Sequence, residues 1–132
     1  MRLWHQELIK YLPRQQLLGQ HRECCALRGK GWNKKHNVVD YIFKYSPYKL
    51  FMYHLLVMNE MYQRNYKVNK LWLHSLYRGK NEIAYLELEP INCGIKIYNE
   101  HDDQYLKECL LNLRSKGIII NLNDERKSQT KI

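Results

Sequence analysis

Apolar side chains recur at helical spacing in three stretches of the chain, and the longest stretch runs from Pro47 to Asn65. Residues spaced three and four apart form a wide apolar stripe there, which predicts a long, central, buried helix. Ser46 is a favoured N-cap and Pro47 suits a first helical position, so we expect the helix to begin at this pair. The stripe consists of Leu50, Phe51, His54, Leu55, Met58, Met61 and Tyr62.

Two further stretches predict helices nearer the ends of the chain. Over Pro13–Leu27 one face gathers apolar, thiol and histidine side chains, and Gly29 follows as a stop signal. A helix is also expected over Asp103–Ser115, with Asp102 as its N-cap and Gly117 just past its end. The face of the first helix contains Leu17, Leu18, His21, Cys24, Cys25 and Arg28.

The segments between these helices are shorter or irregular. Val38–Tyr45 predicts a short helix or a turn, and Val68–Arg78 fits either a helix or a loop. Residues 79–98 lack a regular period, and the polar residues 123–132 predict a flexible, solvated tail. With 132 residues and 16.1 kDa, the chain is expected to form one mainly α, compact domain over residues 1–122.

The same pattern excludes several classes of protein. No apolar run approaches the roughly 18 residues of a membrane span, and residues 1–20 lack the apolar core of a signal peptide. No glycine-rich phosphate loop follows a strand, which excludes a Rossmann or P-loop unit. We therefore expect a cytoplasmic protein that acts away from membranes.

Cysteine and histidine spacing offers no ligand motif. The four cysteines form no C-x-x-C pair, so a structural zinc site is not expected and reduced intracellular thiols are favoured. The six histidines are scattered without an H-x-x-x-H pair. We predict neither a metal nor a cofactor. The cysteines are Cys24, Cys25, Cys93 and Cys109.

Charge is distributed unevenly along the chain, whose net charge is +9. Residues 1–80 hold 15 basic and 4 acidic residues, a net +11, whereas residues 81–132 carry −2. A basic front half favours a polyanionic partner, and aromatic residues among the bases suit stacking on nucleic acid. Trp32, in the basic loop of residues 29–37, is the best stacking candidate. Tyrosines such as Tyr53 are expected to pack with their hydroxyls at the surface.

Glu23 is the only acidic residue between residues 8 and 39, in a stretch that holds seven basic ones. A carboxylate repels phosphates, so it needs a reason to stand in a phosphate-binding region. Both a helical ion pair and a catalytic acid explain it, and the composition leaves the two open. His21 and His54 lie on apolar helix faces, where a hydrogen-bonded core histidine is favoured over a site residue.

A family resemblance is carried by residues 1–4 (MRLW) and residues 12–23 (LPRQQLLGQHRE). These stretches resemble the pyrimidine-dimer DNA glycosylase family, whose founding member is the bacteriophage enzyme endonuclease V. Residues 97–110 (IYNEHDDQYLKECL) are similar to the late helix of bacterial relatives. The resemblance covers most of residues 1–120 and is specific in about the first 25.

This resemblance implies a compact helical DNA glycosylase with abasic-site lyase activity, acting on double-stranded DNA with damaged or abasic sites. In the family the N-terminal α-amine attacks the sugar and forms an imine. Arg2 normally blocks removal of the preceding methionine, so Met1 would carry that amine here. Glu23 matches the family's acid/base. The expected DNA contacts are Arg2, Arg14, His21, Arg22, Arg28, Lys30, Trp32, Lys34 and Lys35.

The chain also departs from the founding member. Ala26 stands where that enzyme has a further arginine, and the C-terminal residues 126–132 contain no aromatic residue. The lesion that the chain acts on therefore stays open. A non-catalytic DNA-binding module on the same fold is the main alternative, and a domain that binds an acidic protein is the third. In each case we expect a monomer.

Overall fold

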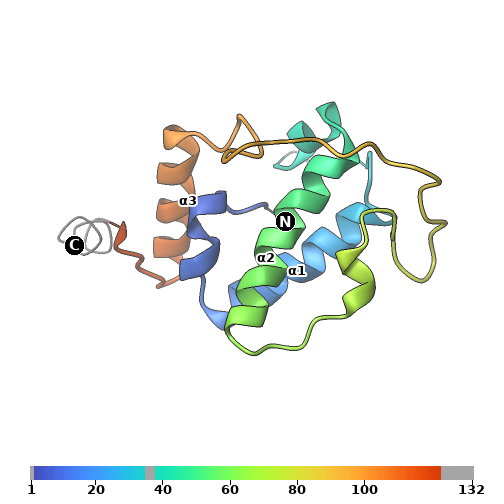
Figure 1. Cartoon of the computed structure of the whole chain (residues 1–132). Helices are drawn as coiled ribbons and strands as arrows, with labels where there is room; N and C mark the ends of the chain where they lie inside the picture. Colours follow the sequence, from blue (N-terminus) through green and yellow to red (C-terminus); the bar gives the residue numbers. More distant parts are fainter. Residues whose placement is uncertain (1, 35–37, 123–132) are drawn as a thin grey trace.

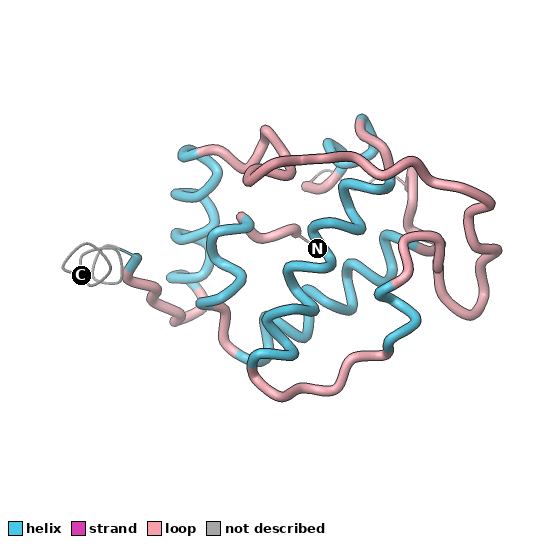
Figure 2. Tube along the Cα trace, viewed as in Figure 1, coloured by secondary structure: helices cyan, strands magenta, loops and turns pink. Residues whose placement is uncertain are grey.

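The computed structural model describes residues 2–34 and 38–122, so the predicted tail over residues 123–132 lies outside the described residues. The elements are η1 (Gln6–Tyr11), α1 (Arg14–Arg28), η2 (Asp40–Lys44), α2 (Pro47–Gln63), η3 (Lys70–Leu73) and α3 (Asp103–Ser115), where η marks a 3₁₀ helix. No strand occurs among these residues (Figure 2), which confirms the mainly α prediction. None of the described helices has the length and apolar character that a membrane span needs.

The predicted central helix is α2, which packs against α1, η1 and η2 (Figure 1). Ser46 caps it as expected, because its Oγ accepts a hydrogen bond of 3.1 Å from the backbone nitrogen of Tyr48. The helix ends at Gln63, two residues earlier than predicted. Asn65 adopts a left-handed φ of 63°, a conformation that turns the chain out of the helix. The fully buried residues of α2 include Leu50, Tyr53, His54, Val57 and Met58.

The first predicted helix is α1, shifted by one residue at each end. Pro13 is its N-cap rather than its first helical residue, and Gly29 closes it by donating to the carbonyls of Cys25 and Ala26. A side chain at position 29 would place a Cβ atom 2.8 Å from the carbonyl oxygen of Arg78. Glycine is therefore required for the later segment to approach the end of α1 this closely.

The N-terminal segment carries an element that the sequence pattern did not predict. η1 is a single 3₁₀ stretch of six residues, of which Leu8 and Ile9 are buried. His5 caps it, because its Nδ1 accepts from the backbone nitrogen of Glu7 at 3.1 Å. In Figure 1 this segment runs between α2 and α3. It contributes Leu3, Trp4, Leu8, Ile9 and Leu12 to the hydrophobic core.

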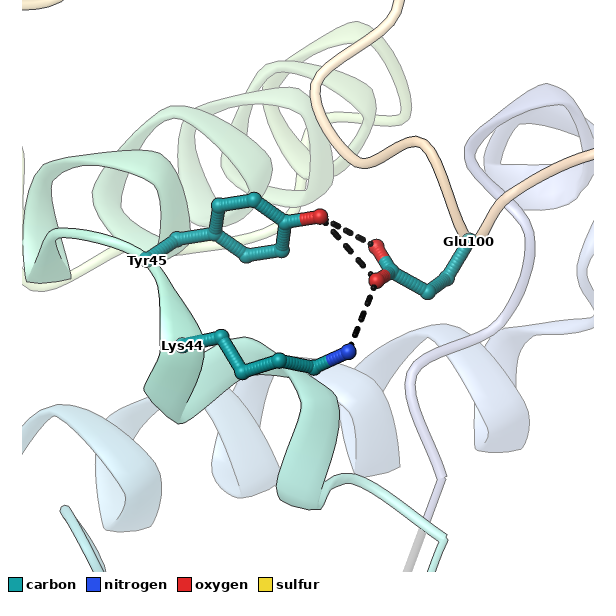
Figure 3. A network of polar contacts seen from close by, with 3 residues as sticks. All are labelled: Lys44, Tyr45 and Glu100. Atoms are coloured by element: carbon teal, nitrogen blue, oxygen red, sulfur yellow. Dashed lines mark hydrogen bonds and ion pairs between the residues drawn. The ribbon is translucent and has the colours of Figure 1, made fainter.

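A long irregular segment leads from η3 to α3, as predicted for residues 79–98, and it runs around the outside of the helices (Figure 2). Glu100 ties its end to η2: the Tyr45 hydroxyl lies 3.0 Å from each carboxylate oxygen, and Lys44 Nζ lies 3.4 Å from Oε2 (Figure 3). Lys49 Nζ also donates to the Ile97 carbonyl at 3.0 Å. These contacts fix the end of the irregular segment just before α3 begins.

The last predicted helix has the predicted bounds. Asp102 caps α3, since its Oδ1 accepts from the backbone nitrogen of Tyr105 at 2.8 Å. Gly117 follows the helix with a left-handed φ of 82°. Tyr105 fixes α3 to the N-terminal segment by donating its hydroxyl to the Leu3 carbonyl at 2.6 Å. Helix α3 is thereby placed beside the first residues of the chain.

Candidate active site

Glu23, the isolated acid of the sequence, lies on α1 against the first described residue of the chain. Its Oε2 accepts a hydrogen bond of 3.3 Å from the backbone nitrogen of Arg2. The same oxygen accepts a bond of 3.2 Å from Nε2 of Gln20, one turn earlier on the helix. Neither bond is to a basic side chain, so the contacts of Glu23 with the described residues are not those of a surface ion pair. The carboxylate is instead bound to the N-terminal backbone.

Gln20 holds the N-terminal segment in this position. Gln20 is 1% exposed, and its amide contacts the backbone of residues 2 and 4. Oε1 accepts from the Trp4 backbone nitrogen at 2.7 Å, and Nε2 donates to the Arg2 carbonyl at 2.9 Å. The two bonds imitate the pairing of an adjacent strand, which fixes residues 2–4 along α1. The sequence carries no signal of this role, because a glutamine within a helix is an ordinary residue.

Tyr53 of α2 also belongs to this cluster of contacts. Its hydroxyl lies 2.5 Å from the Trp4 carbonyl oxygen and 2.9 Å from Gln20 Oε1, and the side chain is fully buried. The expectation that Tyr53 places its hydroxyl at the surface is therefore wrong. Burial raises the pKa of this phenol well above its usual value, so the hydroxyl stays protonated and remains a donor.

A cavity of about 250 Å³ opens beside Glu23. Two cations lie over the Trp4 ring at the edge of this cavity. The Arg2 guanidinium carbon lies 5.7 Å from the ring centroid, and Lys116 Nζ lies 5.2 Å from it. A larger groove of about 570 Å³ lies between η1 and α2, but neither Glu23 nor Arg2 lines it. We place the candidate site in the smaller cavity, where carboxylate and cations converge. Its lining residues are Arg2, Trp4, Glu23, Val38, Asn112 and Lys116.

Comparison with known proteins assigns the chain to a family. A family model described as pyrimidine dimer DNA glycosylase matches residues 1–74, more than half of the chain. The chain belongs to the pyrimidine dimer DNA glycosylase family. No curated protein and no solved structure matches it. The matched residues include Arg2, Gln20 and Glu23 but end before α3. The family assignment confirms the resemblance and indicates a DNA-repair glycosylase.

Four of the cations expected to contact DNA in this glycosylase are exposed in the structure: Arg14, Arg22, Lys30 and Lys34. The Arg14 guanidinium lies 4.7 Å from the Tyr66 ring centroid, which leaves its outer face toward solvent. Arg2 is half-buried and lines the cavity. Met1 and Lys35, the other residues predicted to act in catalysis or to bind phosphate, lie outside the described residues.

Arg28 is placed differently from the prediction, because it is 4% exposed and contacts the interior of the glycosylase. Its Nη1 donates to the Trp72 carbonyl at 2.8 Å, and its Nη2 donates to the carbonyls of His74 and Tyr77 at 2.8 and 3.2 Å. With its donors engaged, this guanidinium does not reach a phosphate outside the protein. Burial lowers its pKa to about 10, which still leaves it charged at neutral pH. We reassign Arg28 from DNA contact to the anchor of the η3 segment.

Trp32 is also less accessible than the sequence suggested. It is half-buried, packs against the core, and meets Phe43 edge to face with ring centroids 5.0 Å apart. The edge-to-face contact covers part of the ring, and the stacking of Trp32 on nucleic acid stays a prediction. The sequence shows a phenylalanine, Phe43, in η2, but only the packing of η2 places its ring against Trp32.

Three potential metal ligands of the glycosylase meet where α1 packs on α2. The ligand atoms of His21, Cys25 and His54 lie within 4.8 Å of one another. His21 and Cys25 are four residues apart on one helix face, a spacing visible in the sequence. Because His54 comes from another helix, however, only the packing reveals the cluster. His54 is fully buried and His21 half-buried, consistent with hydrogen-bonded core histidines.

Hydrogen bonds explain this cluster without a cation. Nη1 of Arg28 lies 2.9 Å from His54 Nδ1, and a guanidinium only donates, so His54 carries its proton on Nε2. That proton is directed at His21 Nδ1, 2.8 Å away. Burial, followed by the charge of nearby arginines, lowers the pKa of both imidazoles. The two rings are thus neutral, and the lone pairs that a metal ion would take already accept hydrogen bonds.

Proposed function

We propose that this chain is a DNA-repair glycosylase with abasic-site lyase activity, in which the α-amine of residue 1 is the nucleophile and Glu23 the acid/base. One observation carries the proposal. The Glu23 carboxylate is hydrogen-bonded, at 3.3 Å, to the backbone nitrogen of the residue that directly follows Met1. Two bonded carbon atoms separate that nitrogen from the α-amine, so covalent geometry tethers a free amine close to the carboxylate.

The chemistry of the two groups is complementary. An α-amine has an ordinary pKa of about 7.7–8.0, so a useful fraction is neutral at physiological pH without a desolvated lysine. Its lone pair attacks C1′ of the sugar, and the base leaves with the electrons of the glycosidic bond and takes up a proton. The amine loses a proton, the C1′–O4′ bond then breaks as O4′ is protonated, and the nitrogen lone pair forms the C=N bond of the imine. Removal of a proton from C2′ then expels the 3′ phosphate. Glu23 accepts and returns these protons and stabilises the positive charge that develops on the sugar.

The substrate we propose is double-stranded DNA that contains a damaged pyrimidine or an abasic site. Exposed cations lie on α1, which also carries Glu23, and in the loop that follows it, and they offer sequence-independent contacts to phosphates. Turning a nucleotide out of the duplex costs a few kcal/mol, and least where damage has weakened stacking. Phosphate contacts by Arg14, Arg22, Lys30 and Lys34 would offset that cost.

Borohydride trapping tests the proposal. On a duplex with a single abasic site, borohydride reduces the imine to a stable amine, so the native protein should become covalently linked to DNA. Mass spectrometry of the adduct should place the link on residue 1. Glu23→Gln should lower the trapping rate by about 10²-fold or more, the range of general acid–base catalysis, with little change in binding.

Two controls separate the enzyme from a non-catalytic DNA-binding module. An N-terminal extension blocks the amine and should abolish trapping, whereas Glu7→Gln changes an acid in the groove by η1 and should leave trapping unchanged. Salt-sensitive DNA binding with no adduct from the native N-terminus would contradict the catalytic proposal. An adduct of full yield from the extended protein would remove residue 1 from the mechanism.

A further inference from the structure

Helix α3 reaches the candidate site with two polar side chains, Asn112 and Lys116, that stand one turn apart. Both lie beyond the residues that the family model matches. Lys116 has an evident role, because its Nζ lies over the Trp4 ring at the rim of the cavity. Asn112 has none in the free protein. Its Oδ1 is buried in the cavity wall and has no hydrogen-bond partner among the described residues.

A buried acceptor without a partner is unfavourable by about 1–3 kcal/mol, and asparagine is also a weak helix former. An apolar residue at position 112 would remove both penalties, as Leu113 does at the next position, where it is fully buried. Among residues 2–34 and 38–122, two other side-chain atoms are buried without a partner, the hydroxyls of Tyr85 and Tyr98, and neither residue lines this cavity. The unpaired acceptor at the Glu23 cavity therefore points to a ligand that brings a hydrogen.

The chemistry of DNA restricts which ligand group that is. Phosphate oxygens and the sugar oxygens of an intact strand only accept hydrogen bonds, while the edges of the bases carry the N–H donors. Phosphates are moreover matched by the two cations at the rim, Arg2 and Lys116. A cavity of about 250 Å³ is large enough for more than a water molecule. An acceptor beside the acid therefore suits a base edge.

We propose that Asn112 is a substrate-contacting residue that accepts a hydrogen bond from the N–H edge of the nucleobase whose sugar is attacked. This rests on the proposed function, because it assumes that the reacting nucleotide enters the Glu23 cavity. The contact exists only while the base is attached. It therefore contributes to base removal and to the choice of lesion, and not to cleavage of a site that has already lost its base.

The test compares two substrates in single-turnover reactions. The first is chosen from a panel of duplexes with one lesion each, including a pyrimidine dimer, as the duplex from which the wild type removes the base fastest. The second is a duplex that carries a preformed abasic site. Asn112→Ala and Asn112→Leu should slow base removal by about tenfold, the ratio that about 1.4 kcal/mol of contact free energy produces. Nicking at the abasic site should change by less than about twofold, because that substrate has no base edge. Gln104→Ala removes an exposed amide from the same helix and should leave both rates unchanged.

Each other outcome overturns the assignment in a recognisable way. Equal losses on both substrates would make Asn112 a structural residue, and unchanged rates on both would show that its amide contacts no base. A wild type that nicks abasic DNA but removes no base from the panel would overturn it as well. Failure of the proposed function looks different, since the wild type would then form no borohydride adduct at all. Thermal melting of each variant confirms that the compared proteins are folded.

Discussion

At the scale of single residues, the site depends on Gln20 as much as on Glu23. Its amide contacts the backbone of residues 2 and 4, the carboxylate of Glu23, and the hydroxyl of Tyr53. All four contacts are made by one buried side chain, so they form together or fail together. The position of the N-terminal backbone relative to the acid is thus set by a residue that takes no part in the proposed chemistry.

Replacing this amide should damage stability and activity together. Gln20→Leu leaves the Trp4 nitrogen and the Arg2 carbonyl without their partners, and we expect the free energy of unfolding to fall by about 2–4 kcal/mol. Urea denaturation measures it, and borohydride trapping at a temperature where the variant is folded should show a slower rate. Tyr53→Phe is the matched control, because it leaves one backbone group, the Trp4 carbonyl, without its partner where Gln20→Leu leaves two, and it should cost about half as much. Equal losses for the two variants would contradict the central role of Gln20.

Arg28 shows at the same scale why a site prediction from sequence fails for some residues. A basic residue in a basic stretch favours DNA contact. Arg28, unlike Arg22, lies on the apolar face of the first helix, but that position does not reveal which groups it bonds. The difference lies in the carbonyls of Trp72, His74 and Tyr77, which come from a segment about 45 residues later. Since irregular backbone leaves its carbonyls unpaired, a buried guanidinium satisfies several of them at once.

At the scale of elements, the caps decide where the helices begin, and α2 offers the clearest test. Ser46→Ala removes the hydrogen bond to the Tyr48 nitrogen, and we expect the free energy of unfolding to fall by about 1 kcal/mol. Trapping should be unchanged, because the cap lies at the end of α2 beside η2 and not in the Glu23 cavity. Ser75→Ala, a serine outside the helices, serves as the control for loss of a hydroxyl. A loss no larger than that control would show that Pro47 alone sets the start of the helix.

The elements also show how much of the molecule the sequence could predict. Helices α1, α2 and α3 were predicted to within two residues, because each combines an apolar period with local stop or cap signals. η1 was missed, because its six residues are too few to show a helical period clearly. Glu23 was singled out by its isolation among cations and by the family resemblance, and its catalytic role stays a prediction. Asn112 and Lys116 were not singled out, because only the tertiary fold brings α3 to the start of the chain.

At the scale of the whole molecule, buried histidines link the stability of the fold to pH. The pKa values of His5, His21, His54 and His101 are lowered, chiefly by burial. His101 is the clearest case, with a pKa lowered to about 3. It accepts from the Gln6 backbone nitrogen at Nδ1, so its proton on Nε2 faces the Tyr41 hydroxyl at 2.7 Å. A second proton on this ring would break the bond to Gln6.

Acid should therefore destabilise the protein well before its carboxylates titrate. In the unfolded chain His101 binds a proton below its ordinary pKa of about 6.5, while in the folded protein it stays neutral down to about 3. These histidines thus leave the free energy of unfolding unaffected above pH ~6.5. Below that pH they lower it, by up to about 1.4 kcal/mol per pH unit for each such histidine. Urea denaturation between pH 7.5 and 4.5 measures this slope. His101→Gln should reduce this slope by the contribution of about one proton. His74→Gln, a change at an exposed position, should leave the slope unchanged. If both variants kept the wild-type slope, the acid sensitivity would have to come from groups other than the buried imidazole between η1, η2 and α3.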